Sequence, residues 1–310
     1  MVVRAEGAAV ISFRYHVVTI VAVFLALAIG LLGGGAFVQP ALQDQLERQT
    51  LEQLRNNAEL REQLDEVRAE VAAMNGFASS ALPYLARDRL IGSTAVIVAH
   101  EDVEDAVVAS AEEALTIGGA EIVASISASS DLFTEDPETQ AQLAEILGIF
   151  SAPPEELSAA AAAALARRLR VAPDDGALPE DDVLNQLLSA GFLDTSEEKP
   201  SLDDIGRSGQ IVVVLAGGAT EESALAPDAF AVPLVDALTE LDVPVAAGES
   251  ATTPVPYVGA VSGDGVVTVD DLDLTMGGAA LVLGLDRLLA TGEGGTYGLK
   301  DGADPLPPLA

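Results

Sequence analysis

The 310-residue sequence predicts an α/β protein in which an N-terminal transmembrane helix and a coiled-coil helix precede an open, mostly parallel α/β sheet domain. Three observations lead to this fold class. An uncharged apolar run comes first, a stretch without Gly or Pro follows, and short β-branched runs then alternate with helical spacings, as in parallel sheets covered by helices. We therefore expect four parts, namely 1–38 (cytoplasmic lead and anchor), 39–76 (coiled-coil stalk), 77–299 (extracytoplasmic α/β domain) and 300–310 (disordered tail).

The apolar run is long enough to cross a membrane. It extends from Val17 to Val38, and Thr19 is its only polar side chain. About 20 apolar helical residues span the hydrocarbon core of a bilayer, so we expect a membrane anchor with Val17 and Val38 at its ends. The small residues 34–36 resemble a signal-peptide cleavage site, and a cleaved signal peptide therefore stays an alternative.

Charges on either side of this run indicate its orientation. Arg4 and Arg14 precede it, whereas acidic residues dominate the chain that follows. Because positive residues stay on the cytoplasmic side, we expect residues 1–13 in the cytoplasm and the chain beyond residue 39 outside it, in the cell envelope.

The next segment is a candidate coiled coil, because residues 41–75 contain no Gly or Pro. Apolar residues there follow a 4-3-4-3 spacing, which places them on one face of a helix. We call this face the seam, and it consists of Leu60, Leu64, Val67, Val71 and Met74. Asn57 falls on the same register and would favour a parallel dimer. The sequence thus predicts a homo-oligomer, and the alternative is a lone amphipathic helix that folds back on its own domain.

The remaining chain carries the strand and helix patterns. Ser93–Ala99 and Glu121–Ser127 are expected strands on either side of a helix over Glu101–Ile117, which together make one βαβ unit. Residues 137–195 have helical spacings, and a further helix is expected over Pro227–Leu241. The other apolar runs, expected to be strands, are Ile211–Ala216, Val243–Ala247 and Ala279–Leu285.

Composition excludes several classes of function. Lys and Arg total 15 against 49 Asp and Glu, and the net charge of −34 excludes a nucleic-acid binder, which needs clustered cations. Cysteine is absent, so disulfides, thiol nucleophiles and thiolate metal sites are excluded. With two histidines, His16 and His100, no multi-histidine metal site can form in one chain.

No catalytic motif assembles, and we expect no enzyme, no catalytic residue and no cofactor-binding residue. The phosphate-binding motifs G-x-G-x-x-G and G-x-x-x-x-G-K-[ST] are absent. Gly217 and Gly218 are interpreted as a tight turn after a strand rather than as an anion site. His100 ends the first strand, where a general base or a metal ligand would lie. The acidic group Asp270, Asp271 and Asp273 is interpreted as a solvated turn, with a hard-cation site as the alternative.

Several stretches, taken in order, resemble the actinobacterial copper-transporter MctB family. They are ISFRYHVVTIVAVFLALAIGLLGGG (Ile11–Gly35), the βαβ unit at 93–127, IVVVLAGGAT (211–220) and the pattern VDDLD…LVLGL…GTYG (Val269–Gly298). The resemblance covers most of the chain. It implies a membrane-anchored envelope protein involved in copper transport and homeostasis, with copper as a ligand. The alternative is an extracytoplasmic α/β ligand-binding or envelope-assembly module unrelated to copper.

The ligand count itself predicts weak binding of Cu(I), a metal that prefers Cys, Met and His. Residues 40–310 offer Met74, His100 and Met276 as soft donors. His100 and Met276 are the candidate metal ligands, and they would meet only where strand ends come together.

Overall fold

The computed structural model describes residues 13–171, 181–195, 202–218, 225–261, 263 and 265–308, and for residues 13–14, 33–47 and 82–83 it describes the backbone alone. The chain divides into two compact units, residues 1–71 and 72–310. A single helix, α1 (Phe13–Ala86), contributes to both. It ends where Asp88 adopts a φ of 64°, in the left-handed region that terminates helices. The stalk helix thus continues ten residues beyond Gly76.

The first unit contains the membrane-length segment. Within the described residues, one helix is long and apolar enough to cross a membrane, over Tyr15–Leu32, with a mean hydropathy of 2.4. None of this segment is buried by other parts of the protein. It lies inside the expected run Val17–Val38 except for its first two residues, and the side chains of 33–38 lie outside the described residues.

The second unit is a seven-stranded sheet in the order β3-β2-β1-β4-β5-β6-β7. All neighbouring strands pair in parallel except β2 and β3, which pair antiparallel at one edge. The fold class expected from the sequence is therefore confirmed. The strands are β1 (Thr94–His100), β2 (Glu121–Ala128), β3 (Leu193–Thr195), β4 (Gln210–Leu215), β5 (Val245–Gly248), β6 (Val266–Val269) and β7 (Gly295–Tyr297).

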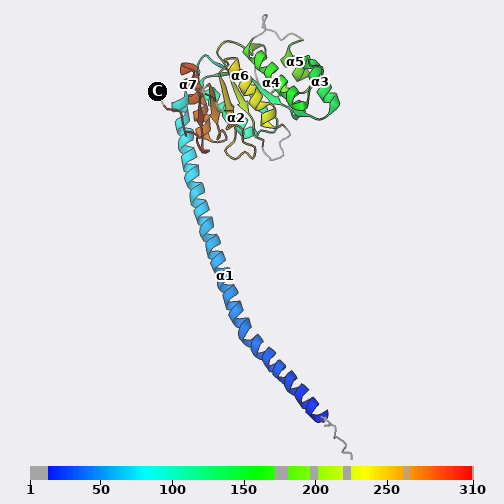
Figure 1. Ribbon diagram of the computed structural model, residues 1–310. Coiled ribbons are helices and arrows are strands. Elements are labelled where there is room, and N and C mark those ends of the chain that lie inside the picture. The colour runs from blue at the N-terminus through cyan, green and yellow to red at the C-terminus, as the bar shows by residue number, and fades with distance from the viewer. Residues whose placement is uncertain are drawn as a thin grey trace, which may run out of the picture. The chain divides into compact units, whose positions relative to one another are not determined.

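Helices cover both faces of this sheet (Figure 1). On one face α2 packs beside α7, and on the other α4 packs beside α6, with α3 and α5 further out. The helices are α2 (Asp105–Gly118), α3 (Pro137–Leu147), α4 (Pro154–Arg170), α5 (Val183–Ser189), α6 (Ala231–Glu240) and α7 (Thr275–Thr291), with the short 3-10 turns η1 (Ser130–Phe133), η2 (Leu202–Asp204) and η3 (Pro227–Ala229).

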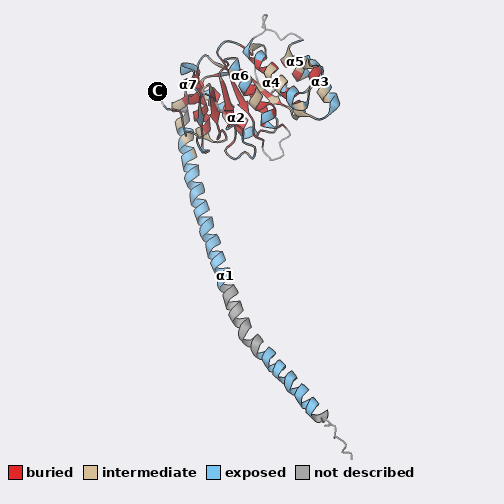
Figure 2. Ribbon diagram, viewed as in Figure 1, coloured by how far each residue is buried: buried red, intermediate tan, exposed pale blue. Residues whose placement is uncertain are grey.

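The inner strands β1, β4, β5 and β6 form the centre of the core and are buried along almost their whole length, as Figure 2 shows for the middle of the sheet. Their side chains alternate between the faces, as the pleat requires. Val96 and Val98 of β1 point to the α4–α6 side, whereas Ala95 and Ile97 point to the α2–α7 side. Because both faces are covered, β1, β4, β5 and β6 are mainly continuous apolar runs rather than alternating ones.

The expectation of a strand over Ala279–Leu285 is wrong, because this run lies inside α7. All of its residues are buried, and a fully buried helix cannot be distinguished from a buried strand by its periodicity. The strands that the sequence reading did not find are β3, β6 and β7, of three or four residues each.

The expectation of a disordered tail over 300–310 is wrong for residues 300–308. Tyr297 pairs with Asp304 in an isolated parallel bridge, and Leu306 packs against the core. The backbone N–H of Lys300 donates to Asp270, which holds the start of the tail against β6. Pro-rich composition suggested disorder, but these specific contacts order the segment.

Candidate functional site

The parallel strands end at one common side of the sheet, which we call the carboxyl edge. Ligands of open α/β sheets bind there, at the point where consecutive connections leave in opposite directions. In this sheet the point lies between β1, which connects onward to β2, and β4, which connects onward to β5. His100 is the last residue of β1, and Gly217 and Gly218 follow β4.

His100 is buried at this point, with 2% of its surface exposed. Its ring lies 6.0 Å from that of Phe230, centroid to centroid, and neither ring nitrogen makes a hydrogen bond of ordinary geometry. Burial lowers the pKa of His100 from 6.5 to about 4, against smaller opposing effects of Asp102, the Leu225 backbone and Glu101. The imidazole is therefore neutral at pH 7, and among the residues that the structure describes no hydroxyl group donates to it as a nucleophile would to its base.

Asp102 and Gly218 occupy the crevice between the ends of β1 and β4. A Cβ atom built on Gly218 would lie 2.8 Å from the carboxyl carbon of Asp102, so the carboxylate rests directly on the glycine backbone. Gly217 adopts a φ of +90°, and a Cβ there would lie 2.8 Å from the hydroxyl of Thr253. The residues that would complete a turn, 219–224, lie outside the described residues, so the tight turn stays a prediction, and an acidic side chain lies against Gly218 where an anion would bind.

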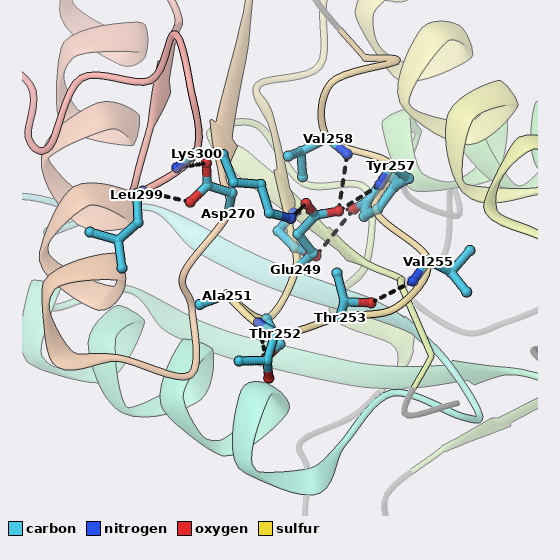
Figure 3. Close-up of polar contacts among 12 residues, drawn as sticks. Glu249, Ala251, Thr252, Thr253, Val255, Tyr257, Val258, Asp270, Leu299 and Lys300 are labelled. Carbon is cyan, nitrogen blue, oxygen red and sulfur yellow. Dashed lines mark hydrogen bonds and ion pairs between the residues drawn. The ribbon is translucent and has the colours of Figure 1, made fainter. Parts of the chain in front are cut away.

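A second polar group lies at the ends of β5 to β7, as Figure 3 shows. Glu249 is fully buried, and one of its carboxylate oxygens accepts hydrogen bonds from the backbone N–H groups of Tyr257 (2.6 Å) and Val258 (3.1 Å). The other oxygen forms an ion pair with Lys300. The Tyr257 hydroxyl donates to the carbonyl of Val214 at 2.7 Å.

These contacts explain how the chain passes from β5 to β6 without a helix. The connection covers residues 249–265, and a loop that enters the core carries backbone N–H groups that need partners. Glu249 supplies acceptors for two of them, while Tyr257 anchors the loop to the sheet. The Glu249–Lys300 group is therefore a structural contact that joins this loop to the C-terminal tail.

The acidic group after β6 is not the solvated turn expected from the sequence, because Asp270 and Asp271 are each 1% exposed. Asp270 accepts hydrogen bonds from the backbone N–H groups of Leu299 (2.7 Å) and Lys300 (3.0 Å). Asp273 accepts one from Ala251 at 2.7 Å. Two of the three carboxylates thus bind the backbone of neighbouring loops.

Asp271 differs from these two neighbours, because its Oδ1 is buried without a hydrogen-bond partner. It lies against the first turn of α7, where a Cβ on Gly277 would be 2.7 Å from that oxygen. Burial raises the pKa of Asp271 to about 6, with further contributions from Asp270 and Asp273. Part of the Asp271 population is therefore protonated in mildly acidic solution.

Within the described residues, no group of three or more His, Asp or Glu side chains is placed to hold a metal ion. The candidate ligands His100 and Met276 come from opposite parts of the sheet. Met276 lies in the first turn of α7, which follows β6, and two strands separate β6 from β1. At about 4.8 Å between strands, these two strands are about 14 Å apart. The fold thus supplies no strand pairing that brings the two donors together.

A cavity of about 300 Å³ lies at the opposite, amino edge of the sheet. Val243 and Pro244 before β5 line it, together with Gly265 before β6 and the ends of α6 and α7. It contains neither His100 nor the buried carboxylates of the carboxyl edge.

The sequence reading missed Glu249, Tyr257 and Lys300. Glu249 carried a usable signal, because it is an acid two residues after the expected strand Val243–Ala247 and so falls at the carboxyl edge. Lys300 is one of two lysines in the chain, but it lay in the segment expected to be disordered.

Taken together, the fold and this edge define an α/β protein with a membrane-length N-terminal helix and an acidic carboxyl edge stabilised by its own backbone. The chain belongs to the family described as copper transport outer membrane protein, MctB, whose model matches residues 10–308. It is 26% identical to "Copper transporter MctB" of Mycobacterium bovis and of Mycobacterium tuberculosis, over 94% of this chain and 98% of each relative. The family resemblance of the sequence is thereby confirmed.

Proposed function

We propose that this chain is a membrane-anchored envelope protein that takes part in copper transport and homeostasis and catalyses no reaction. The observation that carries the proposal is the family match over residues 10–308, which includes both the apolar helix and the α/β domain. Within the described part of the chain the buried His100 has no hydroxyl partner, and the carboxylates of Glu249 and Asp270 accept hydrogen bonds from backbone N–H groups. Both features fit a structural or interaction domain better than a catalytic one.

Growth in graded copper tests this role. A strain from which the gene has been deleted should lose copper tolerance, and the gene supplied in trans should restore it. Unchanged tolerance, together with a small molecule retained by the purified domain, would favour the alternative of a ligand-binding module unrelated to copper.

We further propose that residues 1–13 lie in the cytoplasm and that the α/β domain lies outside it. Arg4 and Arg14 before the segment Tyr15–Leu32 support this orientation, because positive residues remain on the cytoplasmic side. A periplasm-type reporter fused after Gly76 should be active, and activity of a cytoplasmic reporter at that point would reverse the orientation. Intact mass distinguishes a retained anchor from a cleaved signal, since cleavage would remove about the first 36 residues.

We propose that the chain takes part in copper transport without itself binding Cu(I) tightly. The soft donors in residues 40–310 are Met74, His100 and Met276, and a tight Cu(I) site there needs two or more of them to converge. In a competition with a Cu(I) chelator, the purified chain should retain less than one equivalent. A stoichiometric site that is lost in His100→Ala or Met276→Leu would contradict this proposal.

We also propose that the chain self-associates through the seam. Its members Leu60, Leu64, Val67 and Val71 remain 48–57% exposed on α1, which is high for apolar side chains at coiled-coil spacing. Sedimentation of the full chain in detergent should give more than a monomer. Leu64→Asp, which places a charge on the seam, should shift the protein towards monomer.

A further inference from the structure

The exposed seam of α1 has features that select both its partner and the orientation of that partner. Leu60, Leu64, Val67 and Val71 occupy alternating core positions of a heptad, in which 57, 64 and 71 are the a positions and 60, 67 and 74 the d positions. A helix that presents four half-exposed apolar residues in this register fits another helix with the same register. A second copy of the chain carries such a helix.

We propose that α1 pairs with α1 of a second copy in a parallel, in-register dimer whose register is fixed by Asn57. This proposal rests on the self-association proposed above and adds the orientation and the alignment of the two helices. Asn57 occupies an a position, where the two copies of a parallel dimer face each other. Its side-chain amide donates to the carbonyl of Gln53 at 3.3 Å, so the group lies along the helix surface beside the seam.

The antiparallel arrangement places Asn57 unfavourably. In that arrangement each a residue faces a d residue of the other copy, so that Val71 meets Leu60 and Asn57 meets Met74. The amide would then be buried against a thioether without an amide partner, which is unfavourable. In the parallel arrangement each Asn57 meets its own counterpart and the two amides can bond to each other.

The residues beside the seam select the same orientation. Arg61 and Arg68 lie at e positions, both exposed on α1. In the antiparallel pair the e positions face each other, and Arg61 of each copy would lie beside Arg68 of the other. In the parallel pair the e positions face g positions instead, so that Arg68 lies beside Gln63, a hydrogen-bond acceptor. A shared membrane orientation of the two anchors is consistent with this choice.

Because the chain contains no cysteine, single cysteine variants of the full chain test the proposal in membranes. Under mild oxidation, Val71→Cys should form a disulfide between two copies at least 10-fold faster than Glu62→Cys, which lies at the outward f position. Co-expressed Leu60→Cys and Val71→Cys should yield only the two symmetric products. Equal rates for positions 71 and 62, or a dominant mixed 60–71 product, would overturn the parallel register.

Two further variants separate the seam from general effects on the helix. Leu64→Asp should reduce the disulfide yield of Val71→Cys at least 10-fold, whereas Leu51→Asp should leave it unchanged. The two leucines are 53% and 54% exposed, and they differ in that Leu51 lies off the seam. In detergent, where the bilayer no longer aligns the two anchors, Asn57→Leu should allow the mixed 60–71 product, because the constraint on orientation is removed. If sedimentation shows a dimer but the symmetric disulfides do not form, the proposed self-association would stand and the parallel register would be refuted.

Discussion

Asp271 offers a sharp test of the electrostatics at the carboxyl edge. Its side chain is buried, its Oδ1 has no hydrogen-bond partner, and two further aspartates lie beside it. Burial and these neighbours disfavour its ionised form, and its pKa rises from 3.8 to about 6. Asp271→Asn keeps the shape of the side chain and removes the charge. We expect this variant to be more stable than the parent protein at neutral pH.

The sign and the size follow from the change in pKa. A carboxyl group with a raised pKa in the folded state destabilises that state once it ionises, so the cost is absent below about pH 3.8 and complete above about pH 6. A rise of about 2 in pKa corresponds to about 3 kcal/mol. Because solvent at the edge of the sheet weakens such effects, we expect Asp271→Asn to raise the free energy of unfolding by about 2 kcal/mol at pH 7.5.

Urea unfolding of the full chain in detergent measures this change, with the near-ultraviolet circular dichroism of the buried Tyr257 and Tyr297 as the signal. The difference between Asp271→Asn and the parent should be about 2 kcal/mol at pH 7.5 and should disappear near pH 4. Asp301→Asn is the matched control, because it removes the same charge from an exposed turn and should change little. A destabilised Asp271→Asn, or a difference independent of pH, would refute the reasoning.

Three other variants test the same edge. Burial lowers the pKa of His100 to about 4, so the free energy of unfolding decreases as the pH falls from 6.5 towards 4. In the same urea titrations, His100→Leu should remove about 2 kcal/mol of this decrease. Gly218→Ala should destabilise the protein by about 1–3 kcal/mol through its clash with the Asp102 carboxylate, and Asp102→Ala in the same chain should recover most of this, as a double-mutant cycle would show. Lys300→Ala should lower the free energy of unfolding by about 2 kcal/mol, because the buried carboxylate of Glu249 loses its cation. An equal decrease when Lys300→Ala is made in the Glu249→Gln variant would contradict that explanation.

The sequence predicted α2, α4, α6 and four of the seven strands well, because their signals are local. The runs that became β1, β2, β4 and β5 are β-branched, short and separated by helical spacing, as buried parallel strands are. The apolar run that became the centre of α7 failed for a physical reason. A helix buried on all sides has no polar face, and its sequence therefore resembles a buried strand.

The carboxyl edge was predictable only in part, because its contacts join residues far apart in the chain. The position of His100 followed from the end of the first strand. The pairing of Glu249 with Lys300 joins residues 51 apart, and it depends on β7 and on a tail that composition alone suggested to be disordered. Likewise, the Asp270 carboxylate is a buried acceptor for the tail because of where β6 and β7 end, which no local pattern reveals.

The central claim is that this member of the MctB family supports copper homeostasis from the membrane without a tight Cu(I) site of its own. Copper tolerance of a deletion strain tests it most directly, with the parent gene and a gene carrying both His100→Ala and Met276→Leu supplied in parallel. The account predicts that deletion lowers the copper concentration tolerated and that both genes restore it equally. Unchanged tolerance on deletion would contradict the copper role, and restoration by the parent gene alone, with both proteins present at equal levels, would contradict its indirect character.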